Sequence, residues 1–215
     1  MTETCPTCGQ ETKPVNIVCI LDRSGSMYGL MDDMVGAFNG FIKEQKAVPG
    51  EALLTLVAFD NYYDIIHNRT RLHDVPELSR SQVEARGSTA LLDAIGKTIS
   101  GLPDNERTIC LIQTDGHENA SHEYTRESIK KMVEQKTKAG WEFIFTAANV
   151  DAFAASAGLG FDPNNVFNYQ HSQQGYVNNS AMFSCRSTMY RGGMTSDPGD
   201  LEDNAIEETD VLASD

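Results

Sequence analysis

Four short apolar runs, separated by helical patterns, constrain the fold of this chain more than any other feature. The runs occupy residues 15–21, 52–59, 107–114 and 141–147, and they are rich in β-branched and aromatic side chains. Runs of this length and composition are typical of strands that are buried on both faces. Apolar side chains at helical spacing follow within residues 31–47, 86–102 and 124–139. Strands that alternate with helices predict a three-layer, doubly wound α/β fold, with a mostly parallel sheet between two layers of helices.

The remaining elements are shorter or more polar. Residues 63–69 form a polar strand directly after the second apolar run, with no helix between them, which suits a sheet edge or an antiparallel hairpin partner. We further expect a short helix at 152–158, a last edge strand at 166–169 and a C-terminal helix at 172–190.

Two of the apolar runs end in a carboxylate that opens a glycine-containing loop. The sequence DRSGS follows the first run, and DG follows the third. A threonine also lies in the GST loop before the helix of 86–102. Because ligands of parallel sheets bind at the carboxyl ends of the strands, we expect these loops to meet at one edge. Their oxygen donors suit a hard cation such as Mg²⁺. The predicted metal site consists of Asp22, Ser24, Ser26, Thr89 and Asp115.

A structural interpretation of the same residues is also open. Aspartate, serine and glycine after a strand are ordinary turn and helix N-cap residues. Thr89 can likewise be an N-terminal helix residue and nothing more. The residue types alone do not decide between caps and metal ligands.

Charge and hydropathy narrow the functional classes. The net charge is −14, and residues 197–215 contain eight acidic side chains and no basic one, which leaves −6 for the rest of the chain. This balance argues against binding to a phosphate backbone, which needs clustered lysine and arginine. The sequence has no apolar run of membrane-spanning length and no signal-peptide pattern at its start. We therefore expect a cytoplasmic protein that binds neither membrane nor nucleic acid.

Four of the five cysteines form two groups. Cys19 and Cys110 lie inside apolar runs, where we expect reduced core residues rather than a disulfide framework. Cys5 and Cys8 form a CxxC pair, which is half of a zinc knuckle, and no second pair follows. Two interpretations stay open: an unused knuckle in a disordered leader, or a Zn²⁺ site completed by a second chain or a partner. The predicted organisation is a leader at 1–12, one domain at 13–190 and an acidic, disordered tail at 191–215.

The three loops together resemble those of a von Willebrand factor type A (vWA) domain. DRSGSM matches the DxSxS signature of that family, GSTAL supplies its threonine, and QTDG supplies its second aspartate. The resemblance covers about residues 13–190. It implies a six-stranded sheet with one antiparallel edge strand, and a metal-ion-dependent adhesion site at the five residues named above. The chain looks similar to stand-alone intracellular members from bacteria and phages, including those encoded with tellurium-resistance systems.

The resemblance also implies a mechanism of ligand capture. Three neutral hydroxyls would hold Mg²⁺, or Mn²⁺ or Ca²⁺, while one or both aspartates act through water. The ion then keeps net positive charge and an open position that an aspartate or glutamate of a partner protein can fill. This is a binding module, and we expect no enzymatic activity.

Two rival functions remain. A Mg²⁺-dependent phosphohydrolase would also place aspartates at strand ends, but Ser24 stands where a second carboxylate is expected, and no GxxxxGK[ST] loop is present. His117, close to Asp115, is interpreted as a surface residue of its loop. The other rival is a self-assembling structural protein, a homo-oligomer in which Glu202 or Glu207 of the tail occupies the metal site of its own or a neighbouring chain.

Overall fold

The structure is a computed structural model that describes residues 14–194. It contains one six-stranded sheet with the strand order β3-β2-β1-β4-β5-β6. All neighbouring strands are parallel except β2 and β3, so β3 is the antiparallel edge strand. The predicted fold class is confirmed. The strands are β1 (Val15–Asp22), β2 (Ala52–Phe59), β3 (Tyr63–Arg71), β4 (Thr108–Thr114), β5 (Glu142–Ala147) and β6 (Val166–Asn168).

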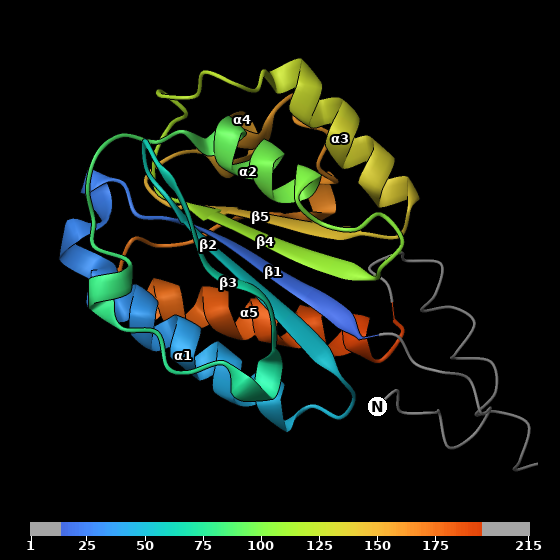
Figure 1. The fold of residues 1–215 in the computed structure, drawn as a ribbon. Coiled ribbons are helices and arrows are strands. Elements are labelled where there is room, and N and C mark those ends of the chain that lie inside the picture. The colour runs from blue at the N-terminus through green and yellow to red at the C-terminus, as the bar shows by residue number, and fades with distance from the viewer. Residues whose placement is uncertain (1–13, 195–215) are drawn as a thin grey trace, which may run out of the picture.

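Helices cover both faces of the sheet, as Figure 1 shows. On one face lie α1 (Met31–Ala47) and α5 (Gln173–Arg191), which pack side by side. On the other face lie α2 (Leu91–Ser100), α3 (Arg126–Lys138) and α4 (Ala152–Ser156). Every residue of β1 and β4 is buried, because each of these strands has a helical layer on both sides. Two separate hydrophobic cores result, one on each face of the sheet.

The two core cysteines show how the sheet separates these cores. Cys19 of β1 belongs to the core beneath α1 and α5, and Cys110 of β4 belongs to the core beneath α2 and α3. Both thiols are buried and free, as the sequence predicts. Burial raises the pKa of Cys19 and of Cys110 well above the usual value, so neither is a reactive thiolate.

The boundaries differ from the predictions at a few points. Strand β3 continues to Arg71, two residues beyond its predicted end, and its pairing with β2 contains register shifts next to Arg69, which has a positive φ of 51°. Helix α3 begins at Arg126 rather than at residue 124, because Thr125 and Ser128 form a capping box there. Short 3-10 helices were not predicted; they are η1 (Gly25–Leu30), η2 (Leu72–Asp74), η3 (Arg80–Gln82) and η4 (Pro163–Asn165).

Several predictions concern residues at the chain ends. The leader with Cys5 and Cys8, and the acidic segment of 197–215, lie outside the described residues. Helix α5 continues to Arg191, one residue beyond the predicted end of the domain. Over residues 14–194, no helix has the length and apolar character needed to cross a membrane.

Candidate metal site

The loops that follow β1 and β4 meet at the carboxyl edge of the sheet. Asp22 is the last residue of β1, and Asp115 directly follows β4, its neighbour in the sheet. Between them, Ser26 Oγ donates a hydrogen bond of 2.7 Å to Asp115 Oδ1. Ser24 Oγ lies 3.2 Å from Ser26 Oγ and 3.5 Å from Asp115 Oδ1. Three of the predicted ligand oxygens therefore converge within hydrogen-bonding distance of one another.

Thr89 joins this group from a third loop, just before α2. A Cβ atom added to Gly116 would lie 3.2 Å from Thr89 Oγ1, so the threonine hydroxyl is next to the residue that follows Asp115. Two hydrogen bonds fix this position: Asn119 Oδ1 accepts from the Thr89 N–H at 2.9 Å, and the Asn119 N–H donates to the Thr89 carbonyl at 3.0 Å. The structure thus brings all five predicted residues to one edge of the sheet.

Asp22 lies behind the hydroxyls and has both of its oxygens engaged. Its Oδ1 accepts from the Ser24 N–H at 2.7 Å, and its Oδ2 accepts from Thr114 Oγ1 at 2.5 Å. Asp22 therefore fixes the start of the loop and contributes negative charge. This arrangement suits an aspartate that acts on a cation through water rather than by direct contact.

The capping interpretation accounts for only part of this geometry. Ser24 occupies the N-cap position of η1, yet its side chain makes no capping hydrogen bond in the described part of the chain. The N-cap of α2 is Ala90 rather than Thr89, and a backbone N–H of the first turn is satisfied instead by Glu118, which accepts from Leu92 at 2.9 Å. Asp22 does act as a turn residue, through the Ser24 N–H. The serine and threonine hydroxyls are not used as caps.

Electrostatics at this edge are unfavourable without a cation. Asp22 and Asp115 are almost fully buried, at 1% and 2% exposure. The pKa of Asp22 is raised to about 6. Burial is the largest cause, and the nearby charge of Asp115 adds to it, whereas the hydrogen bonds from Thr114 and Ser24 lower the pKa. A bound divalent cation would stabilise both ionised carboxylates.

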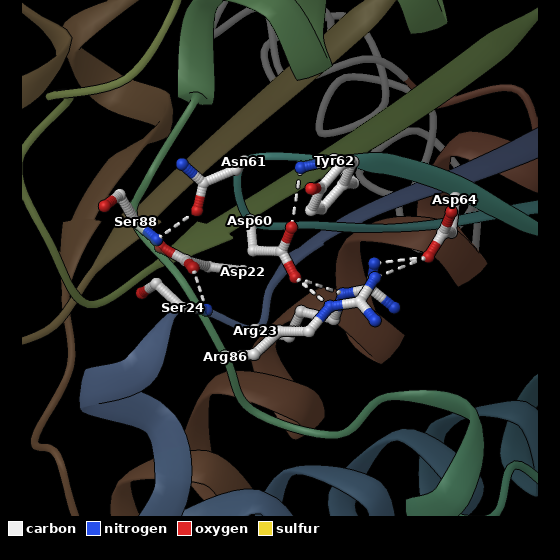
Figure 2. Close-up of polar contacts among 9 residues, drawn as sticks. All are labelled: Asp22, Arg23, Ser24, Asp60, Asn61, Tyr62, Asp64, Arg86 and Ser88. Atoms are coloured by element: carbon white, nitrogen blue, oxygen red, sulfur yellow. Dashed lines mark hydrogen bonds and ion pairs between the residues drawn. The ribbon is translucent and has the colours of Figure 1, made fainter.

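Arg23 does not neutralise these carboxylates, although it follows Asp22 in the sequence. Its buried guanidinium contacts Asp60, where Nε donates to Oδ2 at 3.2 Å, and also Asp64. Arg86 contacts the same two aspartates, with Nε donating to Asp60 Oδ2 at 2.7 Å. Figure 2 shows both guanidinium groups gathered around Asp60 and Asp64. The arginine charge is thereby used to hold the loops together.

The backbone reinforces the same connection. The Arg23 N–H donates to the Phe59 carbonyl at 2.9 Å, and the Arg86 N–H donates to the Arg23 carbonyl at 2.9 Å. Asn61 Oδ1 accepts from the Ser88 N–H at 2.6 Å, next to Thr89, as Figure 2 also shows. The loops after β1, after β2 and before α2 are therefore joined into one unit that positions the hydroxyls.

His171 is a residue at this site that the sequence analysis missed. It lies in the loop between β6 and α5, and its Nε2 is 3.2 Å from Asp115 Oδ2. A signal was present, because His171 comes three residues after the end of β6, at the same edge of the sheet. His117, in contrast, is exposed, as expected.

The donor set fits a divalent cation that prefers oxygen. No three His, Cys, Asp or Glu side chains within residues 14–194 are grouped as a metal site, because the donors here are mainly hydroxyls. Asp115 Oδ2 is buried and has no hydrogen-bond partner among the described residues, so it is available to a cation. Serine, threonine and aspartate oxygens are ligands that Mg²⁺, Mn²⁺ and Ca²⁺ accept.

Comparison with known proteins gives matches in structure only. No protein-family model and no curated protein matches the sequence. One match is proximal thread matrix protein 1 from the mussel byssus, in a structure with zinc in its metal-ion-dependent adhesion site (MIDAS) motif. Its TM-score is 0.63 at 12% identity, over 81% of this chain and 46% of that one. A von Willebrand factor type A protein from Catenulispora acidiphila matches with a TM-score of 0.56 and 13% identity, over 83% of this chain and 43% of that one.

A third match is a single domain of similar length. The von Willebrand factor domain of a type V pilus tip protein from Porphyromonas gingivalis matches with a TM-score of 0.56 and 11% identity, over 82% of this chain and 97% of that one. The chain thus spans less than half of the first two proteins and nearly all of the third. At these identities the similarity establishes a shared fold.

Proposed function

We propose that this chain, which has the fold of a von Willebrand factor type A domain, is a metal-dependent module that binds an acidic residue of a partner protein. Mg²⁺ or Mn²⁺, with Ca²⁺ as a further candidate, would be held by Ser24, Ser26 and Thr89, with Asp22 and Asp115 supporting them. The partner would be a protein with an exposed aspartate or glutamate.

One observation carries this proposal. The hydroxyls of Ser24 and Ser26 lie within 3.5 Å of Asp115 Oδ1, and neither is used as a helix cap among the described residues. Hydroxyl donors are neutral, so they bind a cation without cancelling its charge. A cation held in this way supplies positive charge and a coordination position that a partner carboxylate can occupy.

The surrounding residues prepare the site for this role. Thr114 and the Ser24 backbone hold Asp22 in place, and Asn119 holds Thr89. Asp60 binds the Arg23 guanidinium, so that Arg23 does not compete with the metal for the carboxylates. These contacts are made between protein groups, which reduces the cost of ordering the loops on binding.

Exposed aromatic side chains support a protein partner rather than a small molecule. Tyr28 follows the serine loop in η1, Tyr62 lies in the turn after β2, and Phe153 lies in α4 after β5. Each is at least half exposed and each follows the carboxyl end of a strand. Aromatic residues are enriched in the centres of protein interfaces. The zinc-occupied MIDAS of the byssus protein and the pilus-tip location of another structural match agree with an adhesive role.

The proposal assigns binding and not catalysis to this site. Hydrolysis of a generic phosphate ester that is present in the native chain and absent in Asp22→Ala would contradict it.

A calorimetric titration tests the metal site. Chelator-stripped protein is titrated with Mg²⁺, Mn²⁺ and Ca²⁺, and Ser26→Ala is compared with Ser88→Ala. Ser26 contributes its hydroxyl to the site, whereas the adjacent loop residue Ser88 uses its backbone N–H. We expect one bound ion in the native chain and in Ser88→Ala, and at least tenfold weaker binding in Ser26→Ala.

A second measurement tests the acidic ligand. Gly-Glu-Gly and Gly-Gln-Gly, each with an acetylated N-terminus and an amidated C-terminus, are mixed with Mn²⁺-loaded protein, and proton relaxation of each peptide is recorded. Faster relaxation of the glutamate peptide, reversed by Ser26→Ala, is the expected result. Equal relaxation of both peptides would contradict carboxylate capture.

A further inference from the structure

His171 brings a nitrogen donor to the proposed metal site from a fourth loop. Its Nε2 lies 3.2 Å from Asp115 Oδ2, and both atoms are buried. The other oxygen of the same carboxylate, Oδ1, faces the hydroxyls of Ser24 and Ser26. One oxygen of Asp115 therefore contacts the two serines, and the other faces the imidazole.

The two facing atoms are close but are not hydrogen bonded. Neither Asp115 Oδ2 nor His171 Nε2 has a hydrogen-bond partner within residues 14–194. A charged pair of these groups would direct the Nε2–H bond at the carboxylate oxygen, since that alignment gives the strongest interaction. At 3.2 Å the distance permits such a bond, so the direction of the imidazole is what prevents it.

The distance between the two atoms, together with the missing hydrogen bond, is compatible with two ligands of a single ion. With metal–ligand bonds of about 2.0–2.1 Å, neighbouring ligand atoms are roughly 2.9 Å apart around an octahedral ion and roughly 3.4 Å apart around a tetrahedral one. Their lone pairs point at the ion and not at each other. The observed 3.2 Å lies between the two values.

The backbone holds His171 in this position independently of any metal. Ser172 caps α5, with its Oγ accepting from the Gly175 N–H at 3.2 Å. A Cβ at Gly175 would overlap the Gln170 carbonyl, so only glycine allows the turn that contains His171. Tyr169, on the other side, donates its hydroxyl to the Thr114 carbonyl at 3.3 Å, which joins this loop to the end of β4.

We propose that His171 is a metal ligand, through Nε2, and that it makes this site prefer a late first-row transition ion such as Zn²⁺ to Mg²⁺. The inference rests on the proposed metal-binding function and specifies its metal. Imidazole binds Zn²⁺ readily, whereas Mg²⁺ favours oxygen ligands and retains water. An all-oxygen site would show a smaller preference.

Calorimetry of matched histidine variants tests the proposal. All proteins carry Cys5→Ser and Cys8→Ser, so that the CxxC pair cannot bind zinc, and are stripped with chelator before titration with Zn²⁺ and with Mg²⁺. His171→Ala is compared with His117→Ala, which removes an exposed histidine from the loop after Asp115. His171→Gln serves as a variant that retains side-chain volume, and circular dichroism verifies that each variant is folded.

The expected result is a selective loss. His171→Ala and His171→Gln should weaken Zn²⁺ binding at least tenfold and change Mg²⁺ binding less than twofold, and His117→Ala should change neither. If the variants bound Zn²⁺ and Mg²⁺ with equally weakened affinity, His171 would be a positioning residue and the proposal would be overturned. An unchanged Zn²⁺ affinity would overturn it as well. If the native site binds neither metal, both the assignment of His171 and the proposed function fail. If the native site binds Mg²⁺ but the His171 variants bind Zn²⁺ as the native protein does, only the assignment of His171 fails.

Pulsed electron paramagnetic resonance of the Mn²⁺-loaded proteins provides a direct readout. Coordination by imidazole gives nitrogen modulation in the native and His117→Ala proteins, and this modulation should disappear in His171→Ala. Absence of nitrogen modulation in the native protein would overturn the assignment even if the metal is bound.

Discussion

Thr114 Oγ1, at the end of β4, donates a hydrogen bond of 2.5 Å to Oδ2 of Asp22, at the end of β1. This contact crosses the strand pair at the centre of the sheet and fixes the carboxylate from which the serine loop starts. It also lowers the pKa of Asp22, while burial raises that pKa by more. Metal-free protein therefore carries a buried carboxylate whose ionised form is disfavoured.

Replacing Asp22 with asparagine should stabilise the metal-free protein. Asparagine retains an oxygen for the Ser24 N–H, and its amide can donate to Thr114 Oγ1, whose proton can then turn to the Gly116 carbonyl 3.3 Å away. Since the buried charge is removed, we expect Asp22→Asn to raise the free energy of unfolding at pH 7 by about 1–3 kcal/mol. It should also lose the thermal stabilisation that metal gives the native chain. Denaturant titrations and thermal scans, with and without Mg²⁺, measure both effects.

Stability of the metal-free protein should depend on pH through the same group. The pKa of Asp22 is about 6 in the folded state, whereas the ordinary pKa of an aspartate is 3.8, so folding favours the protonated form. The stability that Asp22 contributes is therefore fully present below about pH 4 and is lost as the pH rises through about 6. The difference in unfolding free energy between native protein and Asp22→Asn should change by up to about 3 kcal/mol over this range. Parallel curves for the two proteins would contradict the shift.

Replacing Gly87 with alanine should weaken metal binding without removing any donor. Gly87 has a φ of +67°, and a Cβ there would overlap Asn61 Oδ1, which accepts from the Ser88 N–H. The positive φ costs of order 1–2 kcal/mol for alanine, and relief of the overlap displaces either the Asn61 amide that holds Ser88 or the loop that carries Thr89. We expect lower stability together with weaker Mg²⁺ affinity.

Gly36 provides the control for this substitution. It is exposed in α1, and a Cβ there meets no atom within 4 Å. Gly36→Ala should raise stability by roughly 0.5–1 kcal/mol through helix propensity and leave the metal affinity unchanged. A Gly87→Ala protein that binds Mg²⁺ as the native chain does would show that Thr89 is not positioned by this loop.

Removing Asp60 should be strongly destabilising. Asp60 is fully buried and accepts hydrogen bonds from Arg23, Arg86 and the Tyr62 N–H, the last at 2.6 Å. Asp60→Ala leaves the buried Arg23 guanidinium with less compensation, for which we expect a loss of about 3–5 kcal/mol by chemical denaturation.

The exposed pair of Asp32 and Arg80 is the matched comparison. Its aspartate side chain is 74% exposed, so Asp32→Ala should change stability by less than about 1 kcal/mol. Similar losses for the two substitutions would contradict the structural role given to the buried Asp60 network.

The fold class and the buried character of the strands could be predicted from the chain, and for a simple reason. Buried parallel strands must be apolar on both faces, so β1, β2, β4 and β5 all appear as continuous apolar runs. The polar composition of 63–69 likewise predicted an edge strand, and β3 occupies that edge. Its two additional residues follow the register shifts near Arg69, which depend on pairing with β2 and have no local signal.

The gathering of the candidate metal-site residues at one edge was predictable for a related reason. Strand ends in a parallel sheet face the same edge, so the aspartates that end β1 and β4 had to lie near each other once the strands were adjacent. The role of each side chain was not predictable. Arg23 follows Asp22 directly, yet its direction depends on Asp60, which lies 37 residues away in the sequence.

The sequence by itself determined the alternation of buried strands and helices, and with it the edge at which Asp22, the two serines and Asp115 gather, because burial patterns and strand ends are local properties of the chain. Only the tertiary structure decided which groups complete that edge. The imidazole of His171 reaches Asp115 across 56 positions of sequence through the packing of β6 and α5, and the burial that raises the pKa of Asp22 arises from neighbouring strands and loops. Distances and desolvation are properties of the packed molecule, and no spacing in the sequence encodes them.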